Sequence, residues 1–185
     1  KSWPGKKGVR AAESLLLRGP EVVPYLVEIL NGKPSQYQPG AAWVLGHLGE
    51  PVHIQVILRA AAKRRTGGRA SAFFDAAWNL DAAKTKHWLF SFLTLKRPVF
   101  RQKATEFLME HVDEKDQRRV LNLLDADSPS VRIAGLRLLE PAKVEDATER
   151  LVQALADLAP AVARQASILL ALRADDAMIA RLNQV

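Results

Sequence analysis

Apolar residues recur along much of the chain at steps of three and four positions, the spacing that places side chains on one face of an α-helix. The clearest stripe follows Pro141 and consists of five apolar residues, Val144, Ala147, Leu151, Leu155 and Leu158. Little of the sequence alternates between apolar and polar residues with the period of two that marks a β-strand. The pattern therefore predicts an all-α protein.

Prolines and glycines divide these helical stretches into pairs. In the clearest pair, Ser128-Pro129 provides a helix start, Pro141 ends the first helix, and Pro160 follows the second helix. The other predicted breaks also contain glycine or proline: Gly19-Pro20, Gly49-Glu50-Pro51, Gly67-Gly68 and Arg97-Pro98. We expect the acidic clusters at 113–116 and 175–176 to lie at helix starts, where carboxylates cap backbone N–H groups.

The pairs repeat along the sequence. Residues 41–46 resemble residues 76–81, and a Val-Arg step followed by small and apolar residues occurs at 9–10 and again at 131–132. Phe100-Arg101 and Val162-Ala163 fit the same place. The units therefore start near residues 10, 39, 74, 101, 132 and 163, with a mean spacing just under 31 residues. A period of this length is typical of helical-repeat solenoids. We expect one domain over residues 1–185, built of about six helical hairpins in a right-handed α-α superhelix.

The repeat also predicts a core, because one hairpin cannot bury its apolar stripe without a neighbour. Small residues are expected where the first helices of successive units approach each other, at Ala42, Ala77, Ala104, Ala134 and Ala166. Larger residues are expected to fill the layer between these helices, at Leu45, Leu80, Leu138 and Leu169, and Leu155 on a second helix is also expected to be buried.

Two segments resemble a known family. Residues 19–30, GPEVVPYLVEIL, resemble the second helix of HEAT-like repeats of the phycobilisome-lyase type, and residues 130–136, SVRIAGL, resemble the first helix of the next unit. The resemblance extends over nearly the whole chain and implies an armadillo-like architecture. Members of this family serve as adaptors, regulators, lyases and DNA-repair enzymes, so the resemblance implies no single function. The third unit departs most from the repeat pattern, because it is longer, lacks the arginine of the Val-Arg step and is rich in aromatic residues.

The composition is that of an ordinary soluble protein, with 48% hydrophobic and 25% charged residues. The absence of cysteine excludes disulfides and Cys-ligated metal sites, and it is compatible with the cytoplasm, which we favour, or with a periplasmic location. The longest apolar runs are far shorter than the ~18 residues that span a bilayer. Since the chain opens at Lys1 rather than Met and ends at Val185 without a polar capping helix, we expect it to be part of a longer protein.

The net charge of +7 is concentrated in the middle of the chain, where residues 59–119 contain 14 Lys/Arg against 7 Asp/Glu. Several of these cations flank the Gly67-Gly68 turn, which could present backbone N–H groups to an anion. We predict a binding patch for a phosphate backbone or an acidic protein, made of Arg59, Lys63, Arg64, Arg65, Arg69, Lys84 and Lys86. The alternative is an ordinary solvated turn among surface charges.

Two other groups of residues are weighed against ordinary structural roles. Aromatic residues surround Asp75, with Phe73, Phe74 and Trp78 expected on one helix and Trp88, Phe90 and Phe92 on the next. An acid beside aromatic rings can bind a cationic nucleobase, but an aromatic core is the favoured interpretation. His47, Glu50 and His53 have a spacing that could suit a metal, but Gly49 and Pro51 interrupt any helix there, so we expect no metal site.

No nucleophile elbow, phosphate-binding loop or dinucleotide-binding motif occurs in the sequence, and we expect no cofactor. The leading hypothesis is a non-catalytic protein-interaction or scaffold solenoid that binds a macromolecular partner, most simply a protein, on its concave face. A second hypothesis is a basic nucleic-acid-binding protein of HEAT-like type, including a glycosylase-like repair enzyme. A weaker third is a HEAT-like lyase or hydroxylase. Whether the chain catalyses any reaction stays open, with a non-enzyme favoured.

Overall fold

The computed structural model describes residues 6–64 and 70–182, and every regular element in that part of the chain is a helix, which confirms the predicted all-α class. Contacts between residues divide the chain into two units, 1–107 and 108–185. The first unit contains α1 (Lys6–Arg18), α2 (Val23–Asn31), α3 (Gln38–Leu48), α4 (Ile54–Ala62), α5 (Ala70–Leu80) and α6 (Ala82–Phe92). The boundary falls within α7 (Pro98–His111), and the second unit continues with α8 (Gln117–Leu124), α9 (Pro129–Leu138), α10 (Ala147–Ala154) and α11 (Pro160–Leu182).

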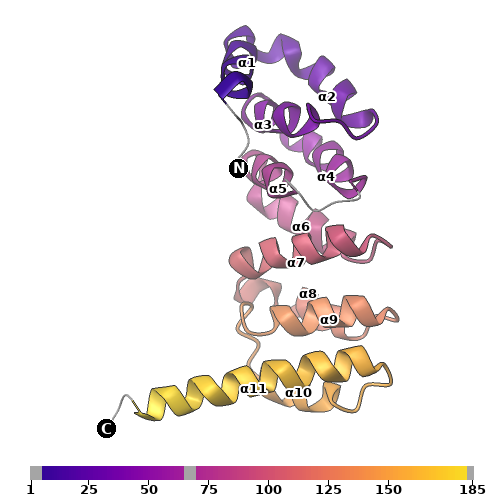
Figure 1. The fold of residues 1–185 in the computed structure, drawn as a ribbon, viewed down its shortest axis with the longest axis vertical. Coiled ribbons are helices and arrows are strands. Elements are labelled where there is room, and N and C mark those ends of the chain that lie inside the picture. The colour runs from indigo at the N-terminus through magenta and orange to yellow at the C-terminus, as the bar shows by residue number, and fades with distance from the viewer. Residues whose placement is uncertain (1–5, 65–69, 183–185) are drawn as a thin grey trace. The chain divides into compact units, whose positions relative to one another are not determined.

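The helices of the first unit form two layers (Figure 1). In one layer α1 packs against α3 and α3 against α5, and in the other α2 packs against α4 and α4 against α6. The layers meet where α2 contacts α3, α4 contacts α5 and α5 contacts α6. The chain therefore alternates between layers, and α2 and α4 end at the same edge of the unit, where the segment before α7 also lies. We call this the loop edge.

Proline begins three of the helices. Pro98, Pro129 and Pro160 are the first residues of α7, α9 and α11, and they are 31 residues apart. Proline suits this position because its φ is already helical and its missing N–H would have no partner within the helix. The same reason explains how Pro24 is accommodated in the first turn of α2.

Most of the predicted breaks are confirmed. Short 3-10 turns occupy Gly19–Val22 and Pro51–His53, and Gly19 adopts a φ of 72°, which only glycine reaches without strain. At the predicted acidic cap, the Asp113 carboxylate accepts from the backbone N–H of Lys115 at 2.9 Å, just before a 3-10 turn at Glu114–Asp116. The predicted break at Gly67-Gly68 lies outside the described residues.

The core of the first unit depends on a close approach of α3 and α5. A Cβ added at Gly46 would lie 2.7 Å from the carbonyl oxygen of Ala76 and 2.8 Å from its Cα, so only glycine fits there. Ala42 and Ala77 are fully buried, as predicted from their small size. Leu45 is also fully buried and confirms the predicted layer between the helices.

In the second unit, α8 packs against α9, and both α9 and α10 pack against α11. Ala134 and Leu138 on α9 are buried, as is Ala166 on α11, which confirms these three predicted core positions. A Cβ at Gly135 would lie 2.8 Å from the side chain of Leu124, so a small residue lets α8 and α9 approach each other.

Several predictions from the sequence are wrong or only partly right. α11 runs without a break through residues 175–176, so the sixth unit is one long helix over 160–182 rather than a hairpin, and this acidic pair does not start a helix. Leu155 is 45% exposed, because α10 ends at Ala154 and the chain turns away before the stripe is complete. Leu80 and Leu169 are half-buried rather than buried.

Candidate functional site: the loop edge of the first unit

The carboxyl end of α2 is held by polar side chains from α3 and α4. Gln38 is fully buried, and its Nε2 donates to carbonyl oxygens at distances of 3.1, 3.3 and 3.4 Å, those of Ile29, Leu30 and Gly32. At the end of α4, Lys63 Nζ donates to the Asn31 carbonyl oxygen at 2.9 Å. These donors satisfy carbonyls that have no partner within α2, and the Lys63 charge opposes the negative end of the helix dipole.

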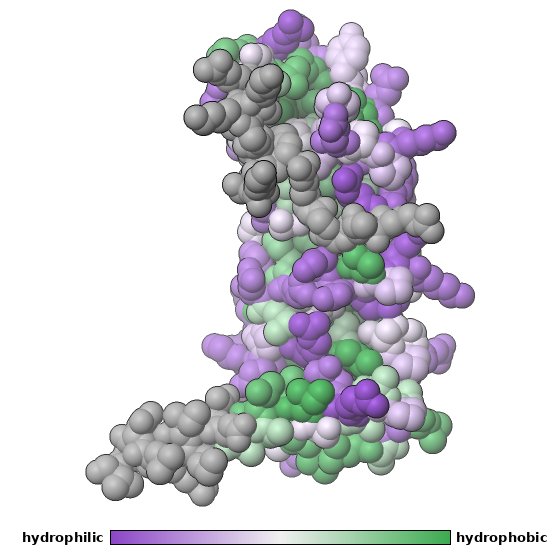
Figure 2. All heavy atoms as spheres, viewed as in Figure 1, coloured by the Kyte–Doolittle hydropathy of each residue, from purple (hydrophilic) through white to green (hydrophobic). Residues whose placement is uncertain are grey.

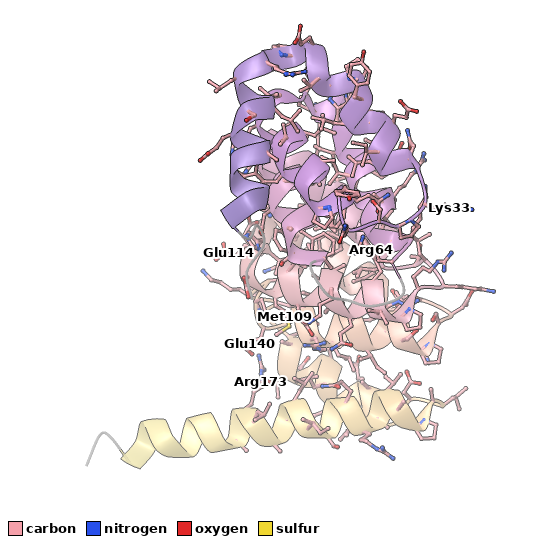
Figure 3. The ribbon with its side chains drawn as sticks, turned by 45° about the horizontal axis from the view of Figure 1, so that its top comes forward. Lys33, Arg64, Met109, Glu114, Glu140 and Arg173 are labelled. Carbon is pink, nitrogen blue, oxygen red and sulfur yellow. The ribbon has the colours of Figure 1, made fainter. Side chains whose placement is uncertain are left out.

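Arg64 lies at the same edge and points inward. Its Nη1 donates to the Ser35 carbonyl oxygen at 3.1 Å and lies 3.4 Å from Gln38 Oε1. Its guanidinium carbon is 5.7 Å from the centroid of the Phe73 ring. Figure 3 shows Arg64 directed into the first unit, whereas Lys33 extends outward. Arg64 therefore fixes the α2–α3 loop, residues 32–37, against the ends of the helices.

Three exposed cations line one open hollow at the loop edge. Lys33 comes from the α2–α3 loop, Lys63 from the end of α4 and Arg97 from the segment before α7. The hollow has a volume of ≈ 540 Å³, and its other lining residues, Asn31, Gly32 and Pro34, carry no negative charge. Figure 2 shows hydrophilic side chains projecting along this edge of the first unit. We call this site the basic hollow, and its charge suits an anionic group.

A second hollow, of ≈ 270 Å³, lies between α1, α2 and α3. Most of its lining residues are apolar and include Leu15, Leu26, Ile29, Tyr37 and Val44. Ile29 is 40% exposed and Tyr37 is 69% exposed, so large apolar surfaces reach solvent at its rim. We call this site the apolar hollow.

The predicted binding patch is distributed over several places. Arg59 is exposed one helical turn before Lys63, while Arg65 and Arg69 lie outside the described residues. Lys84 and Lys86 lie near the start of α6, at the opposite end of that helix from the segment that contains Arg97. The prediction that the seven cations form one electropositive patch is not tested by these positions.

Lys84 takes part in a helix cap. The Asp81 carboxylate accepts from the backbone N–H of Lys84 at 2.9 Å and lies 3.5 Å from its ammonium group. The backbone hydrogen bond is the main cause that lowers the pKa of Asp81, and the Lys84 charge adds to it. Part of the charge predicted for the patch is therefore already matched by a neighbouring carboxylate.

Sequence reasoning did not include Lys33 in the patch, and it gave Arg97 no partner there. Both belong to connecting segments, and nothing in their local sequence marks them as neighbours. The signal that could have found them is topological. In a chain of stacked hairpins, every segment that leads from a second helix to the next first helix reaches the same edge.

Aromatic residues beside Asp75 pack against phenylalanines of α7. Phe73 and Phe74 are buried, and Phe74 meets Phe100 and Phe107 edge to face, with ring centroids 5.6 and 5.4 Å apart. Trp78 also contacts Phe107, at 5.6 Å. This arrangement agrees with the favoured interpretation of an aromatic core.

Two of the histidines make local hydrogen bonds. His47 Nδ1 lies 2.8 Å from the Trp43 carbonyl oxygen, and His53 Nδ1 accepts from the Glu50 backbone N–H at 2.9 Å. The latter bond is half of a capping box around the turn at Pro51. Among the side chains that the structure describes, those of residues 11–64 and 70–174, no three from His, Asp or Glu gather as a metal site requires.

A further hollow of ≈ 490 Å³ lies between α9, α10 and α11 in the second unit. Two of its charged groups are engaged with each other, since Arg173 donates to the Glu140 carboxylate, and Arg173 also donates to the Thr148 hydroxyl. Figure 3 shows Arg173 of α11 directed toward Glu140. Its charged lining residues, Arg137, Glu140 and Arg173, therefore include both signs, whereas those of the basic hollow are all positive.

No helix in the described part of the chain is both long enough and apolar enough to cross a membrane. Compared with known proteins, the sequence matches no family model and no curated protein. The interpretation of the site therefore depends on its geometry and chemistry.

Proposed function

We propose that this chain is a non-catalytic interaction protein, a HEAT-like α-solenoid that binds a macromolecular partner. The observation that carries the proposal is the alternation of helices between two layers in the first unit, with α1, α3 and α5 in one and α2, α4 and α6 in the other. Stacking of this kind builds an extended surface from successive helices, and such surfaces serve binding in helical-repeat proteins.

The proposed form of the whole chain is a right-handed superhelix that continues this stacking along its length. The regular spacing of Pro98, Pro129 and Pro160 supports it, because each begins a helix at the same interval. Small-angle X-ray scattering tests the form. A compact chain of this length has a radius of gyration of about 16 Å, whereas a solenoid exceeds it. A measured value near the compact one would contradict the superhelix.

The chemistry of the loop edge supports binding. Its described side chains offer positive charge at the basic hollow and apolar surface at the apolar hollow, which are the two components of protein interfaces. The partner that we favour is a protein, and the proposal assigns no reaction to the chain.

Photo-crosslinking tests the function. A photoreactive phenylalanine analogue would replace one exposed apolar residue at a time, at Tyr25, Tyr37, Val52 or Leu158, in the full chain expressed in its own cells. We expect the positions that lie on the binding surface to cross-link the same protein, and the remaining positions of the four not to cross-link it. Cross-linking no better than that of the unsubstituted chain at all four positions would contradict the proposal.

Nucleic acid is the second candidate partner, and the basic hollow is the observation that favours it. Fluorescence anisotropy with a labelled duplex and a labelled single strand would test this function. Binding through phosphates must weaken steeply between roughly 50 and 200 mM salt, because each contact releases a condensed counterion. A lack of binding at the lower salt concentration would remove this candidate.

A further inference from the structure

The α2–α3 loop separates two hollows of different character. Lys33 and Pro34 line the basic hollow, and Gln36 and Tyr37 line the apolar hollow, so only Ser35 stands between the two sets of residues. A ligand that follows this loop would meet positive charge on one side and apolar surface on the other.

The loop is held on both sides, which fixes the distance between the hollows. Arg64 binds the Ser35 carbonyl oxygen in the middle of the loop, and Gln38 binds the Gly32 carbonyl oxygen at its start. Lys63 ties α4 to the end of α2 through Asn31. A partner therefore finds the two hollows already in place, and preorganisation of this kind lowers the entropy lost on binding.

On the basis of the proposed function, we infer that the α2–α3 loop docks a protein segment in which carboxylates stand close to an apolar side chain. The carboxylates occupy the basic hollow, where Lys33, Lys63 and Arg97 supply hydrogen-bond donors and positive charge. The apolar side chain enters the apolar hollow and covers the exposed parts of Ile29 and Tyr37.

The walls of the apolar hollow favour a protein over a nucleic acid. Alanine, leucine, isoleucine and valine side chains form most of its surface, and Tyr37 is the aromatic residue that lines it. Such a hollow suits a branched aliphatic side chain or methionine, whereas nucleic acids carry no aliphatic side chain and use bases that stack on aromatic faces. The two hollows together therefore match acidic and apolar residues on one peptide.

The experiment uses the full chain and a phage-displayed library of random peptides as the probe. Peptides selected on the wild-type chain would be synthesised with a fluorescent label and measured by anisotropy on three proteins. These are the wild type, the double variant Lys33→Glu/Arg97→Glu, and the matched control Lys115→Glu/Arg118→Glu, which makes the same charge change at exposed positions of the second unit. A fourth protein, Ile29→Ser/Tyr37→Ser, tests the apolar hollow.

We expect the selected peptides to combine Asp or Glu with a large apolar residue. Each exposed ion pair contributes modestly, but two lost pairs and two new repulsions together weaken binding about tenfold or more in the Lys33/Arg97 variant. The apolar variant weakens binding similarly, and the Lys115/Arg118 control leaves it unchanged. The inference is overturned if no peptides are enriched, if those enriched lack acidic residues, or if they bind all variants alike.

Two further outcomes also overturn the inference. One is displacement of the peptides by single-stranded DNA that itself binds more tightly and loses affinity in the Lys33/Arg97 variant, since the edge would then serve nucleic acid. The other is photo-crosslinking of a protein partner from Val52 or Leu158 but not from Tyr37. The latter result would leave the proposed function standing and remove only this docking site.

Discussion

Arg132 on α9 and Asp157 in the segment before α11 form a two-point ion pair, in which Nε and Nη2 of the guanidinium each donate to a carboxylate oxygen at 2.8 Å. Nη1 of the same arginine donates at 2.8 and 3.0 Å to carbonyl oxygens beyond the end of α8, those of Ala126 and Asp127. One side chain thereby connects the segments that precede α9 and α11. The Asp157 hydrogen bond is also the main cause that raises the pKa of Arg132.

In the first unit, Arg101 makes similar contacts with carbonyl oxygens of the segment before its helix. It is the fourth residue of α7, as Arg132 is of α9, and its Nε and Nη2 each donate at 2.6 Å to carbonyl oxygens beyond α6, those of Leu93 and Leu95. Burial lowers the pKa of Arg101, whose side chain is mostly buried. At these two positions of the sequence repeat, the arginine is therefore a clamp on the preceding carbonyls.

The clamp predicts that arginine and lysine are not interchangeable at position 132. In an Arg132→Lys variant the charge remains, but a single ammonium group cannot reproduce the two-point pair and the carbonyl contacts. We expect the free energy of unfolding to fall by about 1–3 kcal/mol, measured by denaturant titration. Arg118→Lys, at an exposed position of α8, is the matched control and should change it by less than about 0.5 kcal/mol. Equal effects of the two substitutions would contradict the clamp.

Asp157 makes the second unit sensitive to acid. The hydrogen bond from Arg132 is the main cause that lowers the pKa of Asp157 below its ordinary value of 3.8, and the backbone N–H of Ala159 adds to it. The unfolded chain therefore takes up the proton at higher pH than the folded chain. The stabilisation by Asp157 is present above the unfolded pKa and is lost as the pH falls through the folded pKa.

An Asp157→Asn variant tests this dependence, because it keeps the shape of the side chain and removes its titration. We expect the wild type to be more stable than the variant at neutral pH, and the difference to shrink progressively below about pH 5. Thermal unfolding followed by circular dichroism at several pH values measures it. A difference that stayed constant down to acid pH would mean that folding does not change the pKa of Asp157, and would contradict the stabilisation of its charge by Arg132.

Leu138 and Leu155 allow the same substitution to be compared at a buried and at a partly exposed position. Leu138 is fully buried and Leu155 is 45% exposed, although the sequence pattern treats both as core positions. Leu138→Ala should lower the free energy of unfolding by about 2–5 kcal/mol, the cost of a buried cavity, whereas Leu155→Ala should cost less than about 1 kcal/mol. Similar losses in the two variants would mean that Leu155 is buried in solution.

These residues also show which features of the fold could be predicted from the sequence alone. The all-helical class and the starts of several helices could be predicted, because proline at a helix start acts through local backbone geometry. The end of α10 could not, because no proline or glycine stands at Leu155 and the apolar spacing continues past the true end of the helix. The basic hollow could not either, because it joins Lys33, Lys63 and Arg97 from three separate segments.

At Gly46 the backbones of α3 and α5 are so close that a larger residue would meet the Ala76 backbone. Gly46→Ala improves helix propensity by about 1 kcal/mol, but its Cβ would lie under 3.0 Å from the Ala76 backbone, and such overpacking costs about 1–3 kcal/mol or more. We expect a net loss of stability in denaturant titration. Adding Ala76→Gly should not restore it, because the obstructing atoms are the carbonyl oxygen and Cα rather than the side chain. Full rescue by the second substitution would contradict the close backbone approach.

Arg64 and Lys33 have different roles at the loop edge. Arg64 is a structural cation, whereas Lys33 is available to a partner. Arg64 is half-buried and binds the Ser35 carbonyl oxygen, whereas Lys33 is exposed and extends outward. Arg64→Ala should lower the free energy of unfolding by about 1–2 kcal/mol, since it leaves that carbonyl and the Phe73 ring without their partner. Lys33→Ala should leave stability within about 0.5 kcal/mol of the wild type. Hydrogen exchange should show faster exchange of the α2–α3 loop amides in the Arg64 variant alone. The reverse ranking would mean that Lys33 holds the loop and that Arg64 is the cation presented at the surface.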